Sequence, residues 1–172
     1  ATYQWIKDGI DITGATAQSF WASVSGIYQV RVTDGVSCTW TSDAKAVAIQ
    51  PLPTPTVTGA SVGCLSPGVT LSTQSYSAYQ WYKDAVAIAG ATLQSYTATQ
   101  AGSYTVKVTD SYGCQGTSPA TGVTLNTNPL PVVSGASSGC ASPGAVLSTT
   151  TFSGYQWYRD GVLLAGATGP TY

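Results

Sequence analysis

Apolar and polar residues alternate along short stretches of the chain. Val69 and Leu71 alternate with Thr70 and Ser72, and residues 104–109 repeat the pattern. Alternation with a period of two residues is typical of strands that bury one face. Glycine, proline and aspartate recur between these stretches and predict turns. We expect an all-β fold with about seven antiparallel strands in the central region, at 55–60, 68–74, 78–83, 86–89, 93–99, 103–109 and 115–126.

The pattern repeats every 76 residues without an insertion. Trp5, Trp81 and Trp157 keep this spacing, and each ends the tripeptide Tyr-Gln-Trp. The cysteines repeat as the pairs Cys38 and Cys114, and Cys64 and Cys140. A fixed period of this length indicates a tandem array in which each unit contacts mainly its neighbours.

Two proline-containing joints, at 51–55 and 128–131, mark the boundaries of the units. They divide the chain into the back part of one unit (1–52), a complete unit (53–129) and the front part of the next (130–172). Short proline-containing joints favour extended, semi-rigid spacing. Because a part-unit cannot bury its own apolar faces, we expect the chain to be a window from a longer array.

Two sequence features of the complete unit indicate a core between two sheets. Trp81 follows Leu71 by ten residues, and Tyr104 lies two residues before Val106 in Gly-Ser-Tyr-Thr-Val. The spacing resembles immunoglobulin domains, with their core tryptophan and tyrosine corner, although an apolar pair replaces the disulfide between the sheets. The resemblance implies tandem immunoglobulin-like β-sandwich domains, with a structural core made of Trp5, Trp81, Trp157, Leu71, Leu147, Tyr28, Tyr104, Val30 and Val106.

A wider set of motifs narrows the resemblance: Cys-x-x-Pro-Gly, Tyr-Gln-Trp-Tyr-Lys-Asp, Gly-Ala-Thr, Gly-x-Tyr-x-Val-x-Val-Thr-Asp and Gly-Cys. Together they resemble the immunoglobulin-like repeats of large secreted surface proteins of the Bacteroidota, including gliding-motility and adhesin-type proteins exported by the type IX system. The resemblance covers the whole chain and implies an extracellular, cell-surface location.

Charge and composition exclude several functions. Only 8% of the residues are charged, the net charge is -1, and histidine and glutamate are absent. A chain without a basic stripe is a poor partner for nucleic acid, and one without histidine has no imidazole metal site or histidine-based triad. No stretch is long and apolar enough to span a membrane. We therefore expect no catalytic residues, no metal site and no cofactor.

Two kinds of side chain remain as candidates for binding. Tyr82, Tyr158 and the equivalent Ile6 alternate out of phase with the tryptophans and predict an exposed surface that could contact extracellular polysaccharide or another surface protein. Asp34 and Asp110 could contribute to a calcium site between units, but single aspartates at turns more often accept hydrogen bonds from nearby amides. Asp8-Gly9 and Asp160-Gly161 predict hairpin turns.

The cysteines predict disulfides formed in an oxidising compartment. The simplest pairing joins Cys64 to Cys114, a link worth about 4 kcal/mol in the chain-entropy model, and leaves Cys38 and Cys140 to pair outside this chain. In immunoglobulin topology, however, these two positions lie at opposite ends of the domain. Cys64 would then meet the second cysteine of the following unit, and free thiols are the third alternative.

These features predict a structural role. We expect a stalk or filament segment of an adhesin-like bacterial surface protein, which holds a functional tip away from the cell and contacts neighbouring repeats of its own chain. The alternatives are a carbohydrate- or cell-binding module and a spacer of a secreted hydrolase. The residues shared by the units fall on core, turn and cysteine positions, which favours the structural role.

Overall fold

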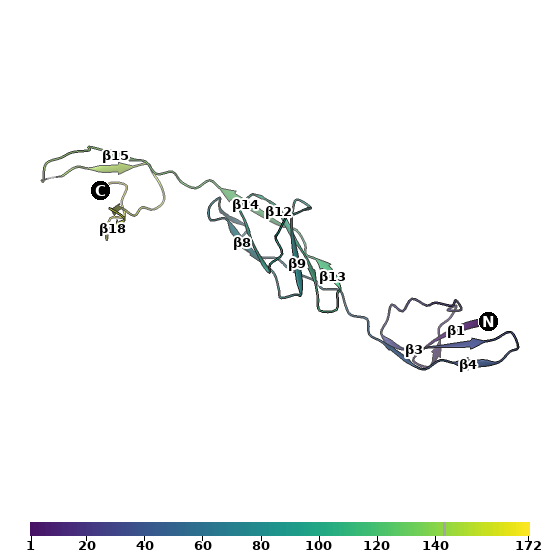
Figure 1. The fold of residues 1–172 in the computed structure, drawn as a ribbon. Helices are drawn as coiled ribbons and strands as arrows, with labels where there is room; N and C mark the ends of the chain where they lie inside the picture. Colours follow the sequence, from purple (N-terminus) through teal and green to yellow (C-terminus); the bar gives the residue numbers. More distant parts are fainter. Residues whose placement is uncertain (143) are drawn as a thin grey trace.

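The structure is a computed structural model that describes residues 1–142 and 144–172. Every regular element among these residues is a β-strand, and the sheets are mainly antiparallel, so the predicted all-β class is confirmed. Figure 1 shows three bodies in a row, joined by extended segments. We refer to residues 1–52, 53–129 and 130–172 as the N-terminal, central and C-terminal bodies.

The central body contains two sheets. The larger has the order β10-β9-β12-β14-β7, with β13 also paired to β12, and the smaller has the order β11-β8-β6. The strands are β6 (Thr58–Gly59), β7 (Val62–Cys64), β8 (Val69–Ser72), β9 (Ala78–Lys83), β10 (Val86–Ala87), β11 (Ser95–Ala98), β12 (Gly102–Thr109), β13 (Gln115–Thr117) and β14 (Thr121–Asn126).

Side chains from both sheets form one hydrophobic core. Leu71 of β8, Trp81 of β9 and Val106 of β12 are fully buried, which is the alternation expected of strands with one buried face. The whole cluster consists of Val69, Leu71, Trp81, Ala91, Ala98, Tyr104, Val106, Val108 and Val123.

Two features of the central body differ from the strands predicted above. First, β7 lies between the predicted strands 55–60 and 68–74 and pairs with β14 in parallel, so the strands are not all antiparallel. Second, the predicted strand 115–126 is divided at 118–120, because Ser118 turns its hydroxyl toward the Val106 amide (3.0 Å) and Pro119 has no amide hydrogen to donate. Short side-chain-to-backbone bonds of this kind are not visible in hydrophobic periodicity.

The outer bodies repeat opposite parts of the central body. The N-terminal body corresponds to the larger sheet: its order is β2-β1-β3-β4, with β5 also paired to β3. The C-terminal body contains a β15–β16 pair that corresponds to β6–β8, and a β17–β18 hairpin. Their strands are β1 (Thr2–Lys7), β2 (Ile10–Asp11), β3 (Gly26–Thr33), β4 (Thr39–Thr41), β5 (Lys45–Val47), β15 (Val133–Gly135), β16 (Leu147–Thr149), β17 (Tyr158–Arg159) and β18 (Val162–Leu163).

The register follows the 76-residue period. Trp5 lies opposite Val30 as Trp81 lies opposite Val106. Gly135 lies opposite Leu147, and the same relationship holds for the pair 59 and 71. Because residues at the same repeat position have the same strand partners, the central body is a direct template for the parts that the outer bodies contain.

Candidate functional site

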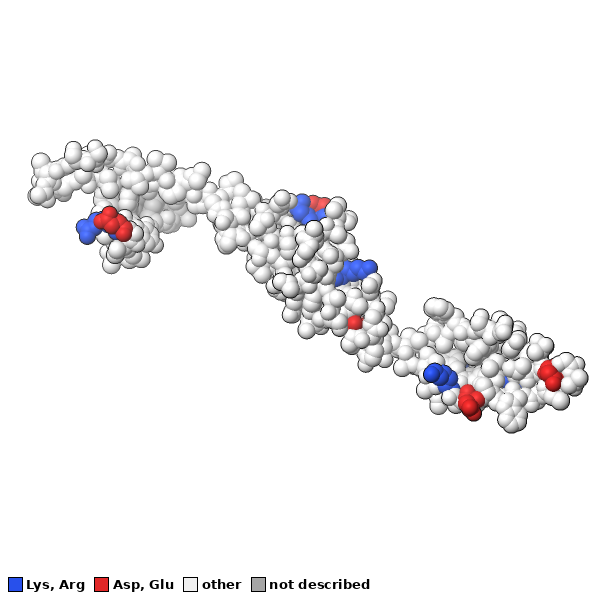
Figure 2. Space-filling model, viewed as in Figure 1, with Lys and Arg blue, Asp and Glu red and all other residues white. Residues whose placement is uncertain are grey.

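Charged side chains make up only 8% of the residues. Figure 2 shows a surface with few and scattered charges. Across residues 1–142 and 144–172, no three Cys, Asp, Glu or His side chains gather where they could hold a metal ion. The arrangements that recur in all three bodies are instead those around the tryptophans, and we describe these as the candidate site.

Trp81 occupies the centre of the central body. Its side chain is fully buried, its indole Nε1 donates a 2.9 Å hydrogen bond to the Leu93 carbonyl, and its ring stacks on Tyr96 with a centroid distance of 6.1 Å. Trp5 and Trp157 donate the equivalent bonds to the carbonyls of Ala17 and Gly169. The indole therefore supplies both core volume and a fixed link to the next segment of the chain.

The glutamine of the Tyr-Gln-Trp tripeptide fastens the hairpin that carries the indole. The Gln80 side-chain amide donates to the carbonyls of Trp81 (2.9 Å) and Ile88 (2.8 Å). Gln4 and Gln156 make the same pair of bonds in the outer bodies. The repetition of the tripeptide was visible in the sequence, but this role of the glutamine was not predicted.

Asp84 connects this hairpin to β12. Its carboxylate accepts hydrogen bonds from the Lys83 ammonium (2.7 Å) and from the Ser103 amide (2.9 Å). The bond from Lys83, followed by that from Ser103, lowers the pKa of Asp84, and the same ion pair raises the pKa of Lys83. In the N-terminal body the Ile27 amide and then Lys7 lower the pKa of Asp8 in the same way.

Tyr104 lies at the same end of this strand pair, opposite Lys83. Its buried hydroxyl donates to the Gln100 carbonyl at 2.8 Å, and Tyr28 donates to the Val24 carbonyl at 2.7 Å. Burial raises the pKa of Tyr104, because the phenolate is the poorly solvated form. Each bond reaches back four residues, as expected for the predicted tyrosine corner.

The aspartates at the following turn bind backbone amides. Asp110 accepts from the amides of Tyr112 and Cys114, both at 2.9 Å, and Asp34 makes the equivalent contacts. This is the turn-forming role that the sequence favoured over calcium binding. The predicted hairpin turns at Asp8-Gly9 and Asp160-Gly161 also have positive φ at both residues.

Burial of the predicted core side chains depends on the body in which they lie. In the central body Leu71, Trp81, Tyr104 and Val106 are at most 1% exposed. In the outer bodies Tyr28 and Trp157 are buried, whereas the remaining predicted positions are half-buried because the opposing layer is missing there. These half-buried residues are Trp5, Val30 and Leu147.

The predicted aromatic surface is discontinuous. Tyr158 is 60% exposed, Tyr82 is half-buried, and Ile6 is buried at 7% exposure, so the prediction that Ile6 is exposed is wrong. Ile6 is paired with Gln29 of β3 on one side and with Asp11 of β2 on the other, so neighbouring strands flank it on both sides. The three equivalent positions thus do not present a common binding face.

The structure does not contain the predicted Cys64–Cys114 bridge: all four cysteines, including Cys38 and Cys140, are free thiols. Cys64 lies opposite Asn126, at the end of β14. Cys114 lies twelve residues before Asn126 in the chain, just before β13, and β13 and β14 both pair with β12. At about 3.3 Å per residue the two cysteines are separated by far more than the roughly 7 Å that a disulfide can span between Cα atoms. The two thiols therefore lie at opposite ends of the central body.

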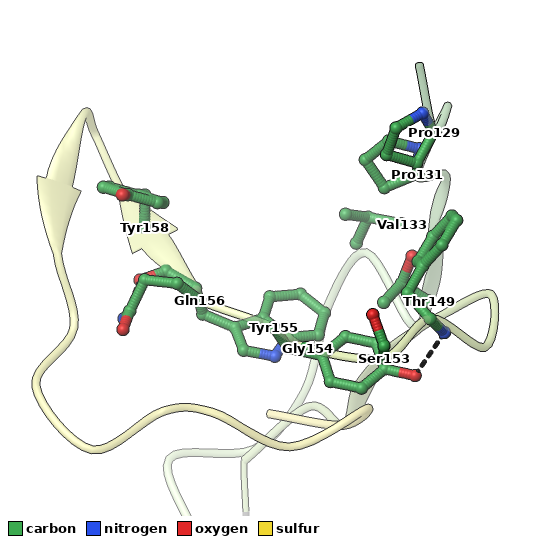
Figure 3. Close-up of a pocket in the computed structure, with 11 residues that line it drawn as sticks. Pro129, Pro131, Val133, Thr149, Ser153, Gly154, Tyr155, Gln156 and Tyr158 are labelled. Carbon is green, nitrogen blue, oxygen red and sulfur yellow. Dashed lines mark hydrogen bonds between the residues drawn. The ribbon is translucent and has the colours of Figure 1, made fainter. Parts of the chain in front are cut away.

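Two apolar grooves occur where the outer bodies lack their second layer. The C-terminal groove measures about 440 Å³ and lies between segment 129–133 and segment 152–158, which carries Tyr155 (Figure 3). The Phe152 amide donates to the Tyr155 hydroxyl at its edge, at 2.7 Å. The N-terminal groove measures about 290 Å³, and its lining includes Trp5, Phe20, Tyr28 and Val30.

Comparison with known proteins does not identify a relative. No protein-family model matches the chain, and no curated protein is significantly similar to it. In the part of the chain that the structure describes, no helix is long and apolar enough to cross a membrane.

Proposed function

We propose that the chain is a stretch of tandem immunoglobulin-like β-sandwich domains that serves as a stalk or filament segment of a secreted bacterial surface protein of the adhesin or gliding-motility type. The observation that carries the proposal is the central body: two sheets share one core around Trp81, and extended joints link the body to its neighbours. The tyrosine corner formed by Tyr104 and Gln100 supports the immunoglobulin-like assignment.

The joints suit a spacer. Residues 48–57 and 127–132 contain no strand and carry Pro51, Pro53, Pro55, Pro129 and Pro131. Proline restricts φ and favours extended backbone, which keeps successive bodies apart. The incoming joint is also anchored, because Pro55 is fully buried in the central body. A row of independent cores with anchored, extended joints transmits force along its length.

The positions of the residues that the repeats share favour a spacer over a binding module. The side chains that recur at the same repeat position, such as Trp81, Gln80 and Asp84, form the core and turns. The exposed aromatic residues differ between repeats: Trp40 stands where the central body has Gly116. A glycan-binding role would require a shared set of exposed contacts.

Single-molecule force extension of the chain, held at its two ends, tests the mechanical role. The central body should unfold in one cooperative step that releases residues 53–129 at about 3.5 Å each. Continuous lengthening without such a step would contradict a load-bearing domain. A glycan array run on the same protein tests the alternative function. Reproducible and competable sugar binding would favour the binding module.

A further inference from the structure

Side-chain hydrogen bonds extend two strand ladders of the central body into the joints on either side of it. Gln74 binds Thr56 in the incoming joint, and Asn128 in the outgoing joint binds Ser66. We propose that Gln74 and Asn128 act as clamps that fix the directions in which the chain enters and leaves the central body. The inference refines the stalk function but does not depend on it, because the clamps are tested without load.

The outgoing clamp lies where the parallel ladder of β7 and β14 ends. The last residue pair of this ladder is Cys64 with Asn126, and the Leu65 amide then donates to the Asn126 carbonyl at 2.9 Å. Because donors alternate along a parallel ladder, the next donor would be residue 67, which is a proline without an amide hydrogen. The backbone ladder therefore cannot continue into the outgoing joint.

The Asn128 side chain takes the place of the missing backbone bonds. Its Oδ1 accepts from the Ser66 amide at 2.9 Å, and its Nδ2 donates to the Ser66 carbonyl at 2.7 Å. Asn128 and Ser66 are also the residues that the register of β7 and β14 places opposite each other. A primary amide offers a donor and an acceptor side by side, as a strand residue does. Two simultaneous bonds thus hold the chain against the domain immediately before Pro129.

The incoming clamp continues the antiparallel pair of β6 and β8 in the same way. Thr58 lies opposite Ser72, and the same register places Thr56 opposite Gln74. Gln74 Oε1 accepts from the Thr56 amide at 3.0 Å, and its Nε2 donates to the Thr56 hydroxyl. The Thr73 hydroxyl also donates to Gln74 Oε1 at 3.0 Å, which orients the side-chain amide for this contact.

Packing of the prolines complements the incoming clamp. Pro55 is fully buried, and the Pro53 backbone lies against Gly116. Apolar packing holds the joint close to the domain but is not directional. The hydrogen bonds of Gln74 are directional, so they add a fixed orientation to this contact.

The clamps are specific to the central unit, although the repeat is otherwise strict. The position of Asn128 is occupied by Leu52 in the N-terminal body. The positions of Thr56 and Gln74 are occupied by Val132 and Thr150 in the C-terminal body. Leucine and valine have no polar side-chain atom, so neither pair can form there, whichever residues lie beside them. The fold is therefore repeated without the clamps, which indicates that they act on the joints.

The clamps determine where the chain can bend. In the incoming joint the Ile49 amide binds the Ser25 hydroxyl of the N-terminal body, so bending falls on residues 50–52. In the outgoing joint the last clamped residue is Asn128, so bending falls on 129–132, where two prolines restrict it. The central body and the inner ends of both joints would then move together as one rigid rod (Figure 1).

Amide hydrogen exchange of the intact chain, followed by NMR, tests the outgoing clamp. Asn128→Ala should make the Ser66 amide exchange about tenfold faster, because a hydrogen bond is lost, and should leave the Val106 amide of the core unchanged. Asn126→Ala is the matched control, since this side chain makes no hydrogen bond to the described residues. An unchanged rate at Ser66, or an equal acceleration at Ser66 and Val106, would overturn the local clamp.

Gln74→Ala tests the incoming clamp in the same measurement. The Thr56 amide should exchange about tenfold faster, because it loses its acceptor. Gln100→Ala is the control, since the Gln100 side chain is exposed and makes no hydrogen bond within the part of the chain that the structure describes. A Thr56 rate that is the same in the two variants would contradict the role of Gln74.

A distance measurement tests whether Asn128 sets the exit direction. In a background with all four cysteines changed to serine, spin labels at Ser103→Cys in β12 and at Leu130→Cys, an exposed position beyond the clamp, should give one narrow distance distribution. Asn128→Leu, which introduces the residue type of the N-terminal body, should broaden the distribution about twofold, whereas Asn126→Leu should not. Equal widths in the three proteins would overturn the proposal while leaving the force test of the stalk function unaffected.

Discussion

The backbone of Pro53 runs directly against Gly116, so that a side chain at residue 116 would overlap the Pro53 carbonyl oxygen. The contact joins the incoming linker to β13 of the central body. In the N-terminal body the same position holds Trp40, which is 82% exposed. The glycine thus permits an approach of linker and strand that the equivalent residue of the other body would prevent.

This contact predicts the effect of Gly116→Ala. The added methyl group must displace either the linker or β13, and we expect a loss of about 1–3 kcal/mol from the free energy of unfolding of the central body. Gly122→Ala is the matched control, since nothing lies within 4 Å of a side chain added there. Urea denaturation followed by tryptophan fluorescence measures both variants, and equal midpoints would show that the linker does not need this approach.

Trp81→Ala tests the core that both sheets share. The residue is fully buried and its indole hydrogen bond fixes Leu93, so truncation should cost about 3–5 kcal/mol. Trp21→Ala removes the same side chain from a site that is 90% exposed and should change the stability by less than about 0.5 kcal/mol. Similar losses in the two variants, measured by circular dichroism during urea denaturation, would contradict the described packing.

Ala85 is a substitution site at which the structure predicts a gain. Its φ is 66°, in the left-handed region, and the equivalent turn positions are Gly9 and Gly161. Glycine adopts this conformation without steric cost, but it also adds backbone entropy to the unfolded chain. The net effect of Ala85→Gly should be a gain in stability of about 0.5–1 kcal/mol. Ala87→Gly, two residues along in β10, should be neutral or destabilising. A lower thermal midpoint for Ala85→Gly would contradict the assignment of strain to this turn.

Several of these relationships could be derived from the sequence, and the reason is the repeat. Trp81, Leu71 and Val106 follow from alternation, and the Tyr104 corner follows from its spacing, because both patterns are set by strand geometry. The parallel β7–β14 pair could not be derived in this way, and the separation of Cys64 from Cys114 was raised only by the topology that the immunoglobulin resemblance implies. They depend on where the chain crosses from one sheet to the other, which alternation leaves undetermined.

The role of Asp84 predicts how stability depends on pH. Hydrogen bonds from Lys83 and Ser103 lower the pKa of its carboxyl in the folded chain, so the folded state holds this proton less tightly than the unfolded state does. The resulting stabilisation is complete above the ordinary aspartate pKa of about 4 and is lost as the pH falls through the lowered folded value. Asp84→Asn should therefore make the thermal midpoint of the central body depend less steeply on pH between pH 5 and pH 2 than it does in the unaltered chain. Asp43→Asn, in the N-terminal body, should leave that slope unchanged, and an unchanged slope for Asp84→Asn would exclude the contribution.

The free cysteines predict the chemical behaviour of the chain. Cys38, Cys64 and Cys140 are exposed and Cys114 is half-buried, so all four thiols should react with a thiol reagent in the folded protein, the last of them most slowly. Because Cys64 and Cys114 lie at opposite ends of the central body, mild oxidation should leave its thermal midpoint unchanged. Mass spectrometry after alkylation counts the thiols, and non-reducing peptide mapping identifies any bridge. Peptide mapping that links Cys64 to Cys114 within one chain would require the two ends of the central body to meet, and would overturn the described strand order.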